Sequence, residues 1–230
     1  MSVKNVIRKK GGYRITAQVG DIYRYREEDY RLVYRNARTF LPKKYGFTPT
    51  HWKTSCWDGY YCQYNVTDDR LYLRELTILD KNGFYPELNG VACDPPKTAQ
   101  ESAQEDLRAE QAAVFYHYGG WPRRYHDVGM FLPYTGRVLA GAEKINGFYT
   151  HLGYQRAQSY KMLKEFVFKN GVLEDVIDHS HVAALLREGI TQRRAEGTWN
   201  MFDEHSLYEQ LPKEDQAKLR WFIDRAVPGL

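Results

Sequence analysis

The chain has 230 residues, of which 43% are hydrophobic and 27% are charged, and its formal net charge is +4. This is the composition of an ordinary soluble globular protein with a real core, built as one large domain or two small ones. No stretch approaches the roughly 20 apolar residues that cross a bilayer, which excludes a membrane-spanning protein.

The N-terminal segment MSVKNVIRKKGGYRI has positive charges but no apolar run behind them, so we expect no signal peptide and a cytoplasmic protein. In that compartment Cys56, Cys62 and Cys93 are expected to be free thiols. The glycosylation pattern Asn65-Val66-Thr67 then has no meaning, because sugars are added to secreted chains.

The first 45 residues are basic and read as strands. They hold 12 Lys/Arg and 4 Asp/Glu, a local balance of +8. Residues 13–19 alternate, and residues 22–36 read as two strands around a polar turn at residues 27–29. Two interpretations stay open, a solvated sheet face and a face that binds nucleic acid or an acidic protein surface. The candidate binding residues on these arms are Tyr23, Arg24, Tyr25, Arg26, Arg31, Tyr34 and Arg35.

A β-hairpin is predicted at about residues 60–76, with its turn at Asp68-Asp69. This register sets Val66 opposite Leu71, Tyr64 opposite Leu73 and Cys62 opposite Glu75. In a straight strand the step from Cys56 to Cys62 spans roughly 20 Å, too far for one zinc ion or a disulfide. We therefore expect no metal here, and a bend at Gly59 is the alternative.

A helix is predicted at about residues 99–118, because Thr98 and Glu101 form a capping box and Gly119-Gly120 ends the pattern. The following segment supplies a second group of candidate binding residues. They are Trp121, Arg123, Arg124 and His126, and the last three of them would form an anion pocket after the helix end. The alternative is an ordinary loop with Trp121-Pro122 as its anchor and solvated arginines.

A second hairpin is predicted at about residues 160–177, because Asn170-Gly171 is a strong turn signal. When the first hairpin sequence is shifted by 102 residues, its turn aligns with the turn of the second. Two explanations remain open, a diverged duplication and two independent hairpins that follow the same rules. His179 and His181 resemble a metal-ligand pair, but caps of a following helix explain them better, so no metal site is predicted.

Shorter helices are predicted at about residues 181–188 and 213–226. Strands interrupted by three helices without β-α-β regularity predict an α+β fold with a mostly antiparallel sheet. We expect one domain over residues 1–230, or two diverged β-rich halves with a boundary near the turn-rich segment 81–98.

No nucleophile elbow, phosphate-binding loop or cofactor motif occurs in the chain, so no catalytic residue and no cofactor is predicted. The sequence favours a non-enzymatic intracellular interaction protein, a complex subunit or partner-capping inhibitor, that binds another protein through an aromatic, Arg-rich sheet face. The alternative is a nucleic-acid-binding protein acting through residues 1–45. A third hypothesis is an enzyme of unrecognised mechanism around residues 117–126.

Overall fold

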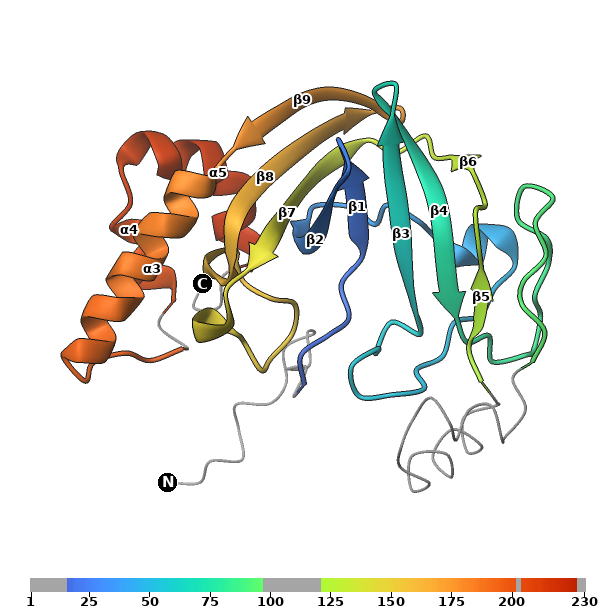
Figure 1. Ribbon diagram of the computed structural model, residues 1–230, viewed down its shortest axis with the longest axis horizontal. Helices are drawn as coiled ribbons and strands as arrows, with labels where there is room; N and C mark the ends of the chain where they lie inside the picture. The colour runs from blue at the N-terminus through green and yellow to red at the C-terminus, as the bar shows by residue number, and fades with distance from the viewer. Residues whose placement is uncertain (1–15, 97–120, 202–203, 227–230) are drawn as a thin grey trace.

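The computed structural model describes residues 16–96, 121–201 and 204–226. For residues 225 and 226 it describes the backbone alone. Its strands are β1 (Ile22–Tyr25), β2 (Glu28–Arg35), β3 (Tyr60–Thr67), β4 (Arg70–Ile78), β5 (Arg123–Tyr125), β6 (Met130–Phe131), β7 (Gly136–Lys144), β8 (Tyr160–Lys169) and β9 (Val172–Asp178). The α-helices are α3 (Ser180–Ala195), α4 (His205–Glu209) and α5 (Lys213–Ala226). The predicted α+β class is confirmed (Figure 1).

The strands form one sheet whose pairings close on themselves. The order is β3-β1-β2-β7-β8-β9-β4-β5, and β3 also pairs with β4. The contact between β9 and β4, which closes the sheet, is short. These two strands pair only where Arg70 lies opposite Val172, next to the two hairpin turns. Among the described strands every pairing is antiparallel except that of β1 with β3. Closure gives the sheet an inner and an outer face and leaves few unpaired strand edges.

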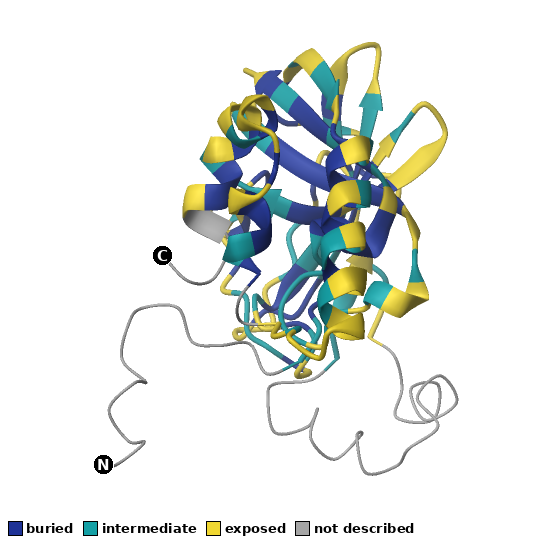
Figure 2. Cartoon of the chain, turned by 90° about the vertical axis from the view of Figure 1, so that its left-hand side faces the viewer, coloured by how far each residue is buried: buried dark blue, intermediate teal, exposed yellow. Residues whose placement is uncertain are grey.

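Apolar side chains fill two separate layers. Inward-facing residues of the strands, including Tyr23, Tyr64 and Phe166, make the inner core. On the outer face of β2, β7 and β8, residues such as Leu139 and Leu163 pack against α3, α4 and α5 and make the outer core. The helices therefore cover one side of the closed sheet (Figure 1), and their exposed residues point away from the buried strands (Figure 2).

Both predicted hairpins form. Asp68 and Asp69 have φ values of 50° and 54°, and Asn170 and Gly171 have 50° and 81°, the positive values that a type I′ turn requires. The predicted pairs of Val66 with Leu71 and of Tyr64 with Leu73 are confirmed.

Two details of the predicted strands are wrong. Cys62 lies opposite Leu76 rather than Glu75, because a register shift between Gln63 and Tyr64 moves the pairing by one residue. The β1–β2 turn is at Arg26-Glu27, both with positive φ, so Glu28 already belongs to β2.

The helix predictions differ in outcome. The predicted helix 213–226 is confirmed, whereas the helix predicted at 181–188 extends over Ser180–Ala195. The short α4 was not predicted, and the helix predicted at 99–118 lies outside the described residues. Of the strand predicted at 13–19, the described part forms only an isolated bridge from Ala17 to Gly153. None of the described helices is long and apolar enough to span a membrane.

The turn at Gly171 gives a stability prediction. We expect Gly171→Val to destabilise the protein by more than about 1 kcal/mol, because φ is +81° and a Cβ would come 2.3 Å from the Leu132 carbonyl oxygen. Gly197→Val is the matched control, since φ there is +71° but no atom lies within 4 Å of a Cβ. The midpoint of urea unfolding should fall further for Gly171→Val, and equal midpoints would show that the close approach is absent.

Candidate interaction surface

The three predicted aromatic anchors lie in the cores and not on one exposed face. Tyr23 is fully buried, and its ring packs 4.8 Å from that of Tyr64 in the inner core. Tyr34 faces α5, where its ring lies 5.5 Å from that of Phe222. Tyr25 is half-buried and meets the edge of Phe166. Tyr23 and Tyr25 lie two residues apart on the same inner face, whereas the register shift between Leu32 and Tyr34 turns Tyr34 to the outer face.

Arg35 is a structural residue in this arrangement. Its guanidinium forms an ion pair with Asp21, and the two side chains are only 10% and 5% exposed. Asp21 also accepts hydrogen bonds from the Cys62 backbone N–H at 2.8 Å and from the Tyr64 hydroxyl at 3.4 Å. This cluster joins β2, β3 and the segment before β1, so it fixes one end of the closed sheet.

The other basic residues of β1 and β2 are exposed but mixed with acidic ones. Arg24 lies 3.7 Å from Asp29, and Arg26 lies 5.0 Å from the centre of the Tyr25 ring. Arg31 is exposed on β2. Because Glu27, Glu28 and Asp29 separate these arginines along the turn, they do not form a single basic patch.

The predicted anion pocket after residue 120 is organised differently. Arg123 donates to the Asp94 carbonyl at 3.2 Å, and His126 lies 3.0 Å from the Asp94 carboxylate. Arg124 donates to the Glu75 carboxylate of β4. Trp121 packs against a small apolar cluster that includes Cys56. The basic groups therefore face acceptors of the protein, while residues 117–120 lie outside the described part of the chain.

Strand register places two rows of side chains side by side on the outer face of β1, β3 and β4. In the first row Arg24 pairs with Asn65, Asn65 with Tyr72, and Tyr72 with Phe131 of β6. In the second, Ile22 pairs with Gln63, Gln63 with Glu75, and Glu75 bonds to Arg124. We call these eight residues the open face, because the described helices pack instead on β2, β7 and β8 (Figure 1).

The open face combines one aromatic pair with charged groups. Phe131 is 40% exposed and its ring meets that of Tyr72 edge to face at 5.9 Å. In the second row, Gln63 donates to the Glu75 carboxylate at 2.9 Å and Arg124 Nε donates to the same oxygen at 3.1 Å. Two arginines, a charged network and a partly exposed aromatic pair thus lie on one continuous surface.

A hollow of about 390 Å³ adjoins the open face at the end nearest the hairpin turns. Its walls are the β1–β2 turn, with Arg24 and Arg26, and the β3–β4 turn, with Asp68 and Asp69. The Asn65 Oδ1 atom at this place is buried and has no hydrogen-bond partner. A donor group of a bound molecule would satisfy that atom.

The two candidate metal-ligand histidines point to different partners. His179 Nε2 lies 2.9 Å from the buried Glu165 carboxylate, and His181 Nε2 lies 2.8 Å from Asp215. In the described residues no group of three or more His, Cys, Asp or Glu side chains is placed to hold a metal ion. Glu165 also forms an ion pair with Arg137 at 3.0 Å, so the His179–Glu165 pair joins α3 to β8 as a structural contact.

The first two cysteines lie in different apolar clusters. The chain bends before β3, with Gly59 at a φ of +74°, so the straight strand assumed for the Cys56–Cys62 step is wrong. Cys56 packs with Trp52 and Leu79, whereas Cys62 belongs to the inner core. Burial raises the pKa of the Cys56 thiol to about 12 and that of the Cys62 thiol well above its ordinary value. Both thiols are therefore poor nucleophiles at neutral pH.

Intact mass and metal analysis test the state of the thiols. All three cysteines are free thiols in the structure. We expect the purified protein to have the mass of the fully reduced chain and less than about 0.1 equivalents of zinc, because in the described residues no three potential ligands are placed to hold an ion. One tightly bound zinc per chain, in protein purified without a chelator, would contradict this assignment.

Sequence reasoning missed most of the open face. Asn65, Tyr72 and Glu75 belong to the predicted β3–β4 hairpin, but the pairing of this hairpin with β1 and with β6, which adds Arg24 and Phe131, joins strands distant in sequence and has no local signal. No family model matches the chain, and no curated protein or solved structure is significantly similar to it. The surface must therefore be interpreted from its own chemistry.

Proposed function

We propose that the protein is a non-enzymatic, intracellular binding protein that docks another protein on its open face, as a complex subunit or as an inhibitor that caps its partner. The observation on which this rests is the row of Arg24, Asn65, Tyr72 and Phe131 across β1, β3, β4 and β6. Arginine and aromatic residues are enriched in protein interfaces, where aromatic groups provide most of the binding energy.

The charge pattern favours a protein partner over nucleic acid. Phosphate binding is strongest where several cations lie together without neutralising groups. On the open face Arg124 is bound to Glu75, and Arg24 lies near Asp29. Nucleic acid stays the second candidate because Arg24, Arg26 and Arg31 are all exposed, and salt dependence separates the two partners.

Affinity capture from the native cell with matched variants tests the proposal. The variant Tyr72→Ala/Phe131→Ala removes the aromatic pair, and Arg24→Glu reverses a charge in the same row. Leu185→Ala is the control, because Leu185 is also a partly exposed apolar residue but lies on α3. We expect a defined protein to bind the wild type and the control, and to bind both open-face variants at least about tenfold more weakly.

Binding must also be reproduced with the purified partner. Equal binding of that partner to the wild type and to both folded open-face variants would refute the proposal. Nucleic acid is tested with generic DNA and RNA at about 50 and 200 mM salt. Tight binding that is lost at the higher salt and in Arg24→Ala/Arg26→Ala would replace the protein partner by nucleic acid.

A further inference from the structure

A second candidate site lies on the helix side of the molecule, away from the open face. A cavity of about 150 Å³ opens between the chain segment from β7 to β8, helix α3 and the residues between α3 and α4. We call it the helix-side cavity. Its walls include the aromatic rings of Phe148, Tyr149 and Trp199, together with Ile190 and Met201. This lining is predominantly apolar, as is usual for sites that bind small molecules.

Two buried acceptors in the wall of the cavity have no partner. Glu204 is 3% exposed and Gln158 is 4% exposed, and both side chains line the cavity. Among the described residues, the Oε1 atoms of these two side chains have no hydrogen-bond partner. Buried polar atoms in folded proteins are nearly always satisfied, so an unsatisfied pair of acceptors at a cavity indicates a missing donor group.

The Glu204 carboxylate has two polar neighbours, the Arg156 guanidinium and the Gln158 side chain. Its Oε2 atom lies 3.4 Å from the Arg156 guanidinium, which leaves Oε1 for another donor. Burial raises the pKa of the Glu204 carboxyl above its ordinary value, while Arg156 and the Gln158 side chain act in the opposite direction. Tyr208, one helical turn further along, is buried and its hydroxyl also has no partner.

Positive charge lines the same cavity. Arg156 and Arg194 contribute two guanidinium groups, against the single carboxylate of Glu204. Arg194 lies 5.2 Å from the centre of the Phe148 ring and donates to the Gly147 carbonyl with one of its nitrogens, so its other N–H groups remain for an anion. The cavity therefore combines unsatisfied acceptors with cationic donors and an apolar wall.

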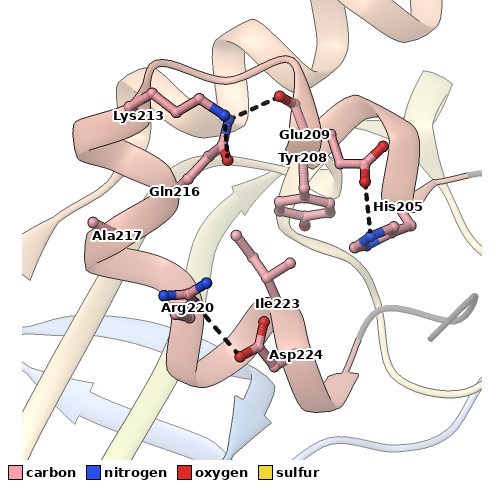
Figure 3. Close-up of a pocket in the computed structure, with 9 residues that line it drawn as sticks. All are labelled: His205, Tyr208, Glu209, Lys213, Gln216, Ala217, Arg220, Ile223 and Asp224. Atoms are coloured by element: carbon pink, nitrogen blue, oxygen red, sulfur yellow. Dashed lines mark hydrogen bonds and ion pairs between the residues drawn. The ribbon is translucent and has the colours of Figure 1, made fainter.

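A larger hollow of about 390 Å³ between α4 and α5 gives weaker evidence of a bound ligand (Figure 3). Its charged side chains pair with each other, His205 with Glu209 at 3.4 Å and Arg220 with Asp224 at 3.8 Å. Lys213 similarly reaches Gln216 at 3.5 Å. His205 Nδ1 and the Tyr208 hydroxyl in its wall are also buried without a partner in the described part of the chain, but its carboxylates, Glu209 and Asp224, are exposed and paired, so it lacks the buried acceptor pair of the helix-side cavity.

We propose that the helix-side cavity binds a small free α-amino acid with an apolar side chain. Its ammonium group would donate to the Oε1 atoms of Glu204 and Gln158, and its carboxylate would accept from Arg194. The apolar side chain would lie among Phe148, Tyr149 and Trp199. A molecule of this class matches the donor, acceptor and apolar groups of the cavity together, whereas a simple cation would face two arginines and a simple anion would leave the acceptors unsatisfied.

Calorimetric titration of the full chain tests this site. The probes are free L-leucine, L-methionine and L-phenylalanine, together with the N-acetyl and the amide derivative of each. We expect at least one free amino acid to bind with a Kd below about 1 mM, and both of its derivatives to bind at least about tenfold more weakly. No binding of any of the three free amino acids at about 10 mM, or equal binding of a derivative, would overturn the proposal.

Paired variants locate the binding. Glu204→Gln removes the buried charge, and Arg194→Gln changes an exposed residue at the wall whose loss the fold should tolerate. The matched controls are Glu209→Gln on α4 and Arg220→Gln on α5, which lie outside the cavity. We expect Glu204→Gln and Arg194→Gln to weaken binding at least about tenfold and both controls to retain it. Unchanged affinity in the folded Arg194→Gln variant would overturn the assigned site.

Discussion

Arg35→Met is expected to destabilise the protein by about 3–5 kcal/mol, because it leaves the Asp21 carboxylate buried without its counter-charge. Arg35 and Asp21 are 10% and 5% exposed, so water cannot replace the lost partner. Asp21 would retain only the Cys62 N–H at 2.8 Å and the more distant Tyr64 hydroxyl. Urea unfolding followed by circular dichroism measures the change in the free energy of unfolding.

Two further variants make the cause specific. Arg24→Met is the matched control, because Arg24 and Asp29 are 43% and 49% exposed and lie 3.7 Å apart, and it should cost less than about 1 kcal/mol. The double variant Asp21→Asn/Arg35→Met removes both charges and should be more stable than Arg35→Met alone. If Arg35→Met cost no more than Arg24→Met, the buried ion pair would not stabilise the fold.

Phe166→Ala is expected to destabilise the protein by about 3–5 kcal/mol, since the change removes a large ring from the closed interior. Phe166 has no exposed surface, and the rings of Tyr25 and Tyr30 meet it edge to face at 5.5 Å and 5.4 Å. Phe166 on β8 is enclosed by side chains of β1 and β2, so the cavity that the missing ring leaves is not expected to collapse. Thermal and urea unfolding should both show the loss.

The same substitution at Phe131 is the control that shows whether the loss of stability comes from the burial of the ring or from the removal of a phenylalanine as such. Phe131 contacts Tyr72 but is 40% exposed, so Phe131→Ala should cost about 1 kcal/mol or less. Comparable losses in the two variants would mean that Phe166 does not lie in a rigid interior.

Local patterns predicted the hairpins well because turn chemistry is local. Asn170-Gly171 and Asp68-Asp69 adopt the left-handed backbone that such turns need, and the alternating residues beside them occupy the expected faces. The register shift after Gln63 has no local signal, and it moved Cys62 from the predicted Glu75 to Leu76. Helix α5 was predicted because its apolar residues repeat at helical spacing.

Closure of the sheet could not be predicted, because it depends on pairings between distant strands. β1 pairs in parallel with β3, and β4 meets β9 about a hundred residues further along the chain. Closure turns Tyr23 into an interior residue, although alternation alone leaves both faces of a strand equivalent. Arg35 meets Asp21 across the neighbouring β1–β2 hairpin, beyond a register shift between Leu32 and Tyr34 that no local pattern signals. The predicted binding surface of β1 and β2 is therefore divided between the two cores and the solvent.

The helix-side cavity was missed for a related reason. Its polar residues Arg156, Gln158, Arg194 and Glu204 come from two separate segments, and none of them belongs to a recognisable motif. Gln158 and Glu204 are buried polar residues that a hydrophobicity pattern assigns to the surface. Only the packing of α3 and α4 against the turn before β8 brings them together.

Photo-crosslinking in the native cell tests the open face most directly. A photoreactive amino acid replaces Tyr72 on the open face or, in the control, Leu185 on α3. We expect a defined protein adduct from position 72 and none of that adduct from position 185. The absence of a protein adduct at position 72, or the same adduct at both positions, would contradict docking of a partner protein on the open face.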